Sequence, residues 1–223
     1  MTNLDELKKI VCRQNIRLKE HNLVILTEGN VSQITEDRKY IVIKPSGVSY
    51  EKLQPEDMAV VDADGKIVEG NLKPSVDTPI HLEIYKKFPE IFGIAHSHSP
   101  YATIFAQAKK EILCYGTTHA DNFNGSVPVT RDLADSEIET NYEKNIAMTI
   151  AEVLNMNIPA VLASGHGPFA FGSSSSQAVD NMQVLEKVAM MALLKEPAGP
   201  LNKNLLEKHY YRKHGINKYY GQN

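Results

Sequence analysis

Two histidines, His96 and His98, are separated by one residue at the end of an apolar stretch. Successive residues of a strand point to opposite faces of a sheet, so these two imidazoles project to the same side and can reach one metal ion. The Ser99-Pro100 pair that follows is typical of a helix start, which places both histidines at a sheet edge, where ligand sites are commonly built. The pair alone is weak evidence, because the chain has eight histidines.

A third histidine, His166, stands between two glycines directly after another apolar stretch. Flanking glycines add little to core packing but let backbone and substrate approach closely. Three imidazoles at strand ends match a catalytic zinc site, in which one coordination position stays open for water or substrate. We therefore predict that His96, His98 and His166 hold one Zn²⁺, with Mn²⁺ or another divalent cation as alternatives. Ordinary loop histidines are the competing interpretation.

Asp77 is the carboxylate that can complete this set of ligands, because it precedes the helix start at Thr78-Pro79. A displaceable carboxylate ligand can also serve as a base. An Asp before Thr-Pro is equally an ordinary helix cap. The spacing leaves both interpretations open.

Two clusters combine glycine with hydroxyl, amide or amine groups beside predicted strands: Gly29-Asn30-Val31-Ser32 and Lys44-Pro45-Ser46-Gly47. Such loops can receive a phosphate through backbone amides and hydroxyls, although as bare patterns they are more often tight turns. Asp121 ends the polar run Thr117-Thr118-His119-Ala120-Asp121 and could donate or accept a proton in catalysis. The alternative interpretation of this run is an ordinary turn. The tyrosine-rich carboxyl end, with Tyr219 and Tyr220, is unusual for a chain terminus unless it docks somewhere.

The elements that must position these residues follow from periodicity and turn signals. An amphipathic helix is expected to end near residue 21, and hairpin signals predict strands in the first third of the chain, at residues 31–34, 40–43, 59–62 and 66–68. In the rest of the chain we expect helices at 79–88, 100–108, 138–153, from the serine run at 173–176, and 202–214, with strands at 91–95 and 160–163. The expected fold is one α/β domain, residues 1–223, with a mixed, largely antiparallel central sheet flanked by helices on both faces.

Composition limits the partners. The 223 residues are 42% apolar and carry a net charge of −3, without a block of like charge, so neither nucleic acid nor a membrane surface is an expected partner. The amino terminus lacks the pattern of a secretory signal, and no apolar stretch approaches the roughly 20 residues needed to span a bilayer, so a cytoplasmic location is expected. Two cysteines cannot build a disulfide framework or a cysteine zinc knuckle.

In their order along the chain, these clusters resemble the class II aldolase and sugar-phosphate epimerase family, most closely its members that epimerise a pentulose phosphate at C4. The resemblance spans nearly the whole chain and rests on seven blocks, Gly29-Asn30-Val31-Ser32, Ile43-Lys44-Pro45-Ser46-Gly47, Asp77-Thr78-Pro79, His96-Ser97-His98-Ser99, Gly116-Thr117-Thr118-His119-Ala120-Asp121, Ser164-Gly165-His166-Gly167-Pro168-Phe169-Ala170 and His209-Tyr210-Tyr211-Arg212-Lys213-His214-Gly215. An aldolase that releases the aldehyde, and a non-catalytic binding domain like the adducin head, are the alternatives within this fold.

The resemblance implies a role for each matched residue. It assigns zinc to His96, His98 and His166, with Asp77 near or on the metal, and a sugar-phosphate substrate whose phosphate is received by Asn30, Lys44, Ser46, Gly47 and Ser75. It implies metal-assisted cleavage and re-addition across C3–C4, with Asp121 and Tyr220 as acid and base. It also implies a homotetramer in which Tyr220 reaches a neighbouring subunit's site, so that active sites lie at subunit interfaces.

Two residues depart from the family pattern. Val76 stands where a second serine is expected after Ser75, which removes one hydroxyl contact to phosphate. Glu28 stands before Gly29 where an aromatic or small residue is expected. A carboxylate beside a phosphate loop would repel the substrate if it pointed inward.

Overall fold

A seven-stranded sheet forms the centre of the computed structural model, which describes residues 3–194 and 199–221. The strand order is β4-β3-β2-β1-β5-β7-β6, and every neighbouring pair is antiparallel, which confirms the predicted α/β class with its largely antiparallel sheet. The strands are β1 (Asn30–Ile34), β2 (Tyr40–Ile43), β3 (Ala59–Asp62), β4 (Ile67–Glu69), β5 (Gly93–His96), β6 (Ala160–Ala163) and β7 (Gly167–Gly172).

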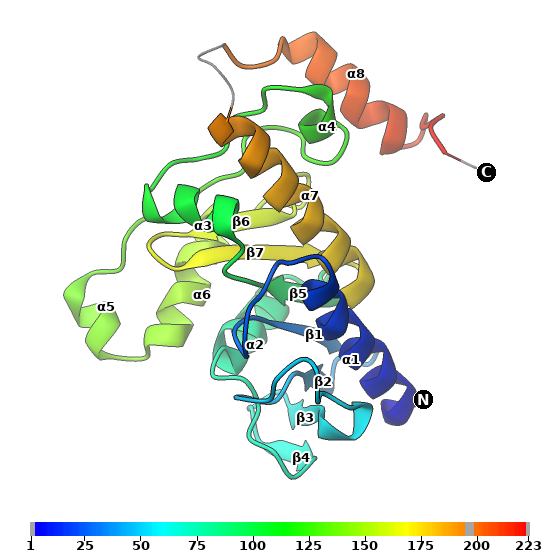
Figure 1. The fold of residues 1–223 in the computed structure, drawn as a ribbon, viewed down its shortest axis with the longest axis vertical. Coiled ribbons are helices and arrows are strands. Elements are labelled where there is room, and N and C mark those ends of the chain that lie inside the picture. Colours follow the sequence, from blue (N-terminus) through cyan, green and yellow to red (C-terminus); the bar gives the residue numbers. More distant parts are fainter. Residues whose placement is uncertain (1–2, 195–198, 222–223) are drawn as a thin grey trace.

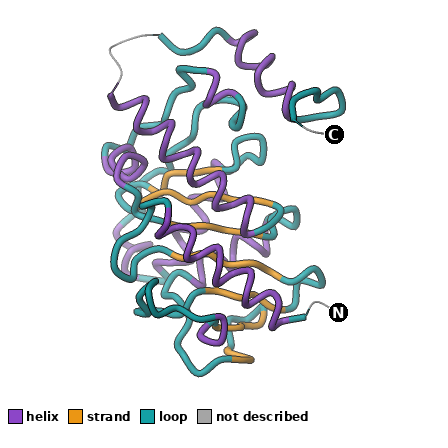
Figure 2. The backbone as a smooth tube through the Cα atoms, turned by 45° about the vertical axis from the view of Figure 1, so that its right-hand side comes forward, coloured by secondary structure: helices purple, strands orange, loops and turns teal. Residues whose placement is uncertain are grey.

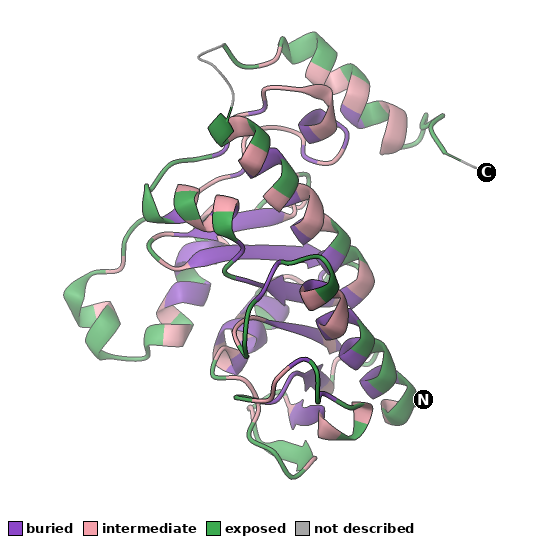
Figure 3. Ribbon diagram, viewed as in Figure 1, coloured by how far each residue is buried: buried purple, intermediate pink, exposed green. Residues whose placement is uncertain are grey.

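Helices cover both faces of the sheet, as predicted (Figures 1 and 2). One face carries α1 (Leu4–Glu20), α3 (Pro100–Gln107) and α7 (Ser175–Leu194), and the other carries α2 (Thr78–Lys87) and α6 (Tyr142–Val153). The period of two along each strand separates two cores: Val42 packs beneath α1 and α7, whereas its neighbour Ile41 packs beneath α2 and α6. Figure 3 shows the central strands buried and the edge strand β4 exposed.

The structure differs from the expected elements in two places. No strand was predicted after His166, but Gly167–Gly172 form β7, which lies between β5 and β6. Proline cannot donate to a ladder and is rare inside sheets, and Pro168 is accommodated at the second residue of the strand. The single helix expected at residues 138–153 is instead two, α5 (Asp135–Glu139) and α6, because Asn141 adopts a left-handed conformation with φ of 52°.

The carboxyl-terminal helix α8 (Lys203–Lys213) lies apart from the sheet and packs on the one-turn helix α4 (Thr117–Ala120) (Figure 1). A short 3₁₀ helix, η1 (Pro55–Asp57), completes the described elements. Among the described residues, no helix combines the length and the apolar character that crossing a membrane requires.

Candidate metal centre

The three predicted histidines come together at one end of the sheet. His96 is the last residue of β5, His98 follows it, and His166 lies in the turn between β6 and β7. The antiparallel pairing of β5 with β7, in which His96 is opposite Phe169, brings residues 70 positions apart into contact. One ligand nitrogen from each imidazole lies within 4.8 Å of the others, and the Nε2 atoms of His96 and His166 are 3.0 Å apart. This group can hold one metal ion.

The protonation of these imidazoles suits metal binding. Burial lowers the pKa of His96 to about 3 and also lowers the pKa of His166, so both rings are neutral at pH 7. The Nδ1 atom of His96 is 3.0 Å from the carbonyl oxygen of Pro168, so that nitrogen carries the proton and donates it. The Nε2 lone pair of His96 is then free, in the form of imidazole that ligates a metal.

Asp77 lies beside this group rather than capping the helix that follows it. Asp77 is the residue immediately before α2, yet its side chain makes no capping hydrogen bond to that helix. Its Oδ2 atom accepts from Nδ2 of Asn30 at 2.7 Å and lies 4.0 Å from Nε2 of His96. Although burial opposes ionisation, the neighbouring imidazoles and the Asn30 amide lower the pKa of Asp77. An anionic carboxylate beside neutral imidazoles is a donor set suited to a divalent cation.

A cavity of about 330 Å³ joins the histidines to all five residues that the resemblance assigns to phosphate binding. Ser75 accepts from the Asn30 amide at 3.1 Å, and its backbone amide donates to the Lys44 carbonyl at 3.0 Å. These two bonds connect the segments that contain Asn30, Lys44 and Ser75. The five phosphate-binding candidates that line the cavity are Asn30, Lys44, Ser46, Gly47 and Ser75. Val76 is 69% exposed, so the position that lacks the expected hydroxyl lies at the rim.

Lys44 is the buried cation of this cavity. Its side chain is 1% exposed, its ammonium donates to the Thr27 carbonyl at 3.1 Å, and it lies 4.9 Å from the centre of the Tyr50 ring. Burial lowers the pKa of Lys44 to about 8. Among the residues that the structure describes, no carboxylate pairs with Lys44, so its charge at neutral pH is available to an anionic ligand.

Asp121 and Tyr220 do not line this cavity, and the structure places both with Arg212 on the α4–α8 end of the chain. The Arg212 guanidinium donates to both oxygens of Asp121, at 3.0 and 2.7 Å, and lies 5.0 Å from the centre of the Tyr220 ring. His209 also contacts Asp121, at 3.0 Å. Burial opposes ionisation, but hydrogen bonds from Arg212 and His209 lower the pKa of Asp121.

Three residues near these groups received no role from the sequence. Arg212 and His209 belong to the block at residues 209–215, which is part of the family resemblance but did not point to Asp121. Glu28, noted only as a departure, lines the histidine cavity.

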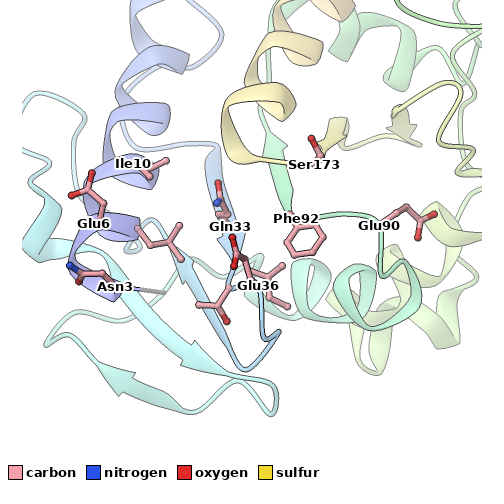
Figure 4. Close-up of a pocket in the computed structure, with 11 residues that line it drawn as sticks. Asn3, Glu6, Ile10, Gln33, Glu36, Glu90, Phe92 and Ser173 are labelled. Atoms are coloured by element: carbon pink, nitrogen blue, oxygen red, sulfur yellow. The ribbon is translucent and has the colours of Figure 1, made fainter. Parts of the chain in front are cut away.

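A second cavity, of about 510 Å³, lies at the opposite end of β1 from Asn30 (Figure 4). Asn3, which caps α1, and Glu6 and Ile10 of α1 face Gln33 and Phe92 across it. Its described lining residues include three glutamates and no basic residue, so it does not suit a phosphate.

The fold, with three histidines at one end of its sheet, is that of the class II aldolases. The chain belongs to the family of the class II aldolase and adducin N-terminal domain, whose model matches residues 9–193. Two curated relatives, each described as L-ribulose-5-phosphate 4-epimerase UlaF, from Salmonella paratyphi B and Salmonella paratyphi C, are 45% identical over 227 residues, covering 98% of this chain and 100% of theirs.

Solved structures agree with this assignment. An L-fuculose 1-phosphate aldolase is 25% identical and superposes with a TM-score of 0.78, over 93% of this chain and 95% of its own. YgbL from Escherichia coli, 24% identical, superposes with a TM-score of 0.77 over 92% of this chain and 98% of its own, which supports the fold. The family resemblance expected from the sequence is thus confirmed.

Proposed function

We propose that this chain is an L-ribulose-5-phosphate 4-epimerase, which interconverts L-ribulose 5-phosphate and D-xylulose 5-phosphate. The observation that carries the proposal is the 45% identity to proteins of that name over 98% of this chain and the whole of theirs. The cavity that joins the three histidines to Lys44 and its neighbouring loops supports it, because a sugar phosphate needs both a cation site and an anion site.

In this proposal His96, His98 and His166 hold the divalent cation, and Asp77 lies near it or binds it. Imidazole and carboxylate donors suit zinc, and manganese or another divalent cation is the alternative. When bound, the cation supplies Lewis acidity that stabilises negative charge on the ketose oxygens. The substrate phosphate is held by Lys44 and the polar groups that surround it, which are Asn30, Ser46, Gly47 and Ser75.

Asp121 and Tyr220 handle the protons in this proposal. Asp121 is a carboxylate at neutral pH, which hydrogen bonds from Arg212 and His209 stabilise, and it accepts the C4 hydroxyl proton as the C3–C4 bond breaks. The aldehyde fragment rotates and is attacked on its other face, and Tyr220 donates a proton to the new hydroxyl. Neither residue lines the histidine cavity of its own chain, which supports an action of Tyr220, together with Asp121, on a neighbouring subunit's site in a homotetramer.

Product analysis tests the proposal. Purified protein supplied with zinc, and separately with manganese, is incubated with L-ribulose 5-phosphate, and the sugars are followed by NMR. A mixture of L-ribulose 5-phosphate and D-xylulose 5-phosphate is expected, with no net cleavage. This activity would serve pentose breakdown in the cytoplasm, such as the use of L-arabinose or ascorbate.

An aldolase is the second candidate, and the superposition on an L-fuculose 1-phosphate aldolase favours it. Accumulation of free glycolaldehyde phosphate and dihydroxyacetone in the same NMR experiment would establish cleavage in place of epimerisation. A non-catalytic domain like the adducin head has no need of three converging imidazoles. Metal analysis that finds no divalent cation would revive that alternative.

A further inference from the structure

Glu28 lines the histidine cavity, yet neither phosphate binding nor proton transfer accounts for it. It closes the turn that precedes β1: its backbone amide donates to the Ile25 carbonyl at 3.2 Å, and its Oε1 atom accepts from the Ile25 amide at 3.1 Å. The second carboxylate oxygen, Oε2, takes no part in this turn and lies 3.6 Å from Nδ1 of His98. The carboxylate therefore points inward, toward a predicted metal ligand.

The backbone around Glu28 is fixed against the end of β5. The Tyr50 hydroxyl lies 2.7 Å from the Glu28 carbonyl oxygen and 3.0 Å from that of Gly29. Gly29 has φ of +71°, and a Cβ there would come within 2.9 Å of the His96 carbonyl oxygen. The approach of Glu28 to His98 is thus built into the fold of the loop and does not depend on a free side chain finding its partner.

A carboxylate at Nδ1 of a histidine has a specific consequence for metal binding. It accepts the Nδ1 proton, which fixes the tautomer and orients the ring so that the Nε2 lone pair is presented to the cation, and it raises the basicity of the imidazole. His96 receives the same support from the neutral carbonyl of Pro168. For His98 the corresponding partner is the Glu28 carboxylate, whose Oε2 atom at 3.6 Å is within ion-pairing distance but farther than a hydrogen bond.

We propose that Glu28 is a positioning residue for the metal site, acting through His98 to tighten the binding of the divalent cation. The inference rests on the proposed function, because it takes His98 as a ligand. It also accounts for a carboxylate in a cavity meant for phosphate: its charge is offset by the cation-bound imidazole, which reduces its repulsion of the substrate.

The test is the dissociation constant for Zn²⁺, measured at pH 7 by competition with a chelating dye. Glu28→Gln keeps an oxygen for the Ile25 amide and removes only the charge, so the turn is retained. We expect this variant to bind Zn²⁺ about 10- to 100-fold more weakly than the wild-type chain. Glu36→Gln is the matched control, since Glu36 is an exposed glutamate lining the other cavity (Figure 4). Its dissociation constant is expected to be unchanged.

A double-mutant cycle with His98→Ala separates a role through His98 from a general effect of charge. If Glu28 acts through His98, Glu28→Gln weakens binding no further in the His98→Ala background. Wild-type affinity in Glu28→Gln, or an equal loss in both backgrounds, would overturn the role of Glu28 alone. A wild-type chain that binds no divalent cation would overturn the metal enzyme as well, so the two failures are distinguishable.

Discussion

At the scale of the residue, burial determines the protonation state of two groups in the cavity, His96 and Lys44. His96 and Lys44 are almost fully buried, and in both the charged form is disfavoured. For His96 the consequence is a neutral ring at any physiological pH, which is the form that ligates a metal. For Lys44 the lowered pKa lies close to the working range, so its charge depends on pH.

Phosphate binding should therefore weaken as the pH rises through about 8, the lowered pKa of Lys44. Below that pH the ammonium is charged and attracts the substrate phosphate, which is a dianion above its second pKa of about 6. Above it the amine is neutral and the attraction is lost. We expect kcat/KM to fall about tenfold per pH unit above the pKa. Lys44→Met should have a lower kcat/KM at pH 7 and lack this decline, and profiles of the same shape in both proteins would contradict the assignment.

At the scale of the element, close packing at Gly93 lets β5 reach the site. A Cβ at Gly93 would lie 2.2 Å from the carbonyl carbon of Ser174, in the backbone that leads into α7. Gly93 is also paired with Gly172 of β7. These two paired glycines thus allow the start of α7 to lie directly against β5 and β7. At the opposite end of this strand pair, β5 ends at His96 and β7 begins directly after His166.

Gly93→Ala should destabilise the protein by about 1–3 kcal/mol, because the clash is with backbone that cannot move aside. Gly116→Ala is the control, since among the described residues, its two chain neighbours aside, no atom lies within 4 Å of a Cβ placed there, and we expect a change below about 1 kcal/mol. Thermal unfolding at one protein concentration measures both. Equal midpoints for Gly93→Ala and the wild-type chain would show that the α7 junction is looser than its backbone positions indicate.

How much could be predicted from the sequence depends on how local the signal is. The three histidines and the two glycine-containing loops were predictable because each cluster follows or begins a strand. Strand β7 was not, because Gly167 and Pro168 favour a loop locally and become strand only through pairing on both sides. The link between Asp121 and Arg212 joins residues 91 positions apart, and no periodicity or spacing encodes such a tertiary contact.

At the scale of the whole molecule, the residues proposed for catalysis form two separate groups. The cation and phosphate residues surround the end of β5, whereas Asp121, Arg212 and Tyr220 are joined to one another at the α4–α8 end of the chain. Figure 1 shows α4 and α8 lying beyond the end of the sheet. In the proposed mechanism, a single chain therefore contributes residues to two different sites.

This division predicts complementation between two inactive variants. His96→Ala should lose the cation but keep a functional tail, whereas Tyr220→Phe should keep the cation and lose the proton donor. In oligomers assembled at random from equal amounts of both, a site with an intact cation group meets an intact tyrosine in about a quarter of cases, so about a quarter of wild-type activity should return. Native mass spectrometry verifies that the chains have mixed. If mixed oligomers are no more active than the two variants assayed separately, Tyr220 serves the site of its own chain or none.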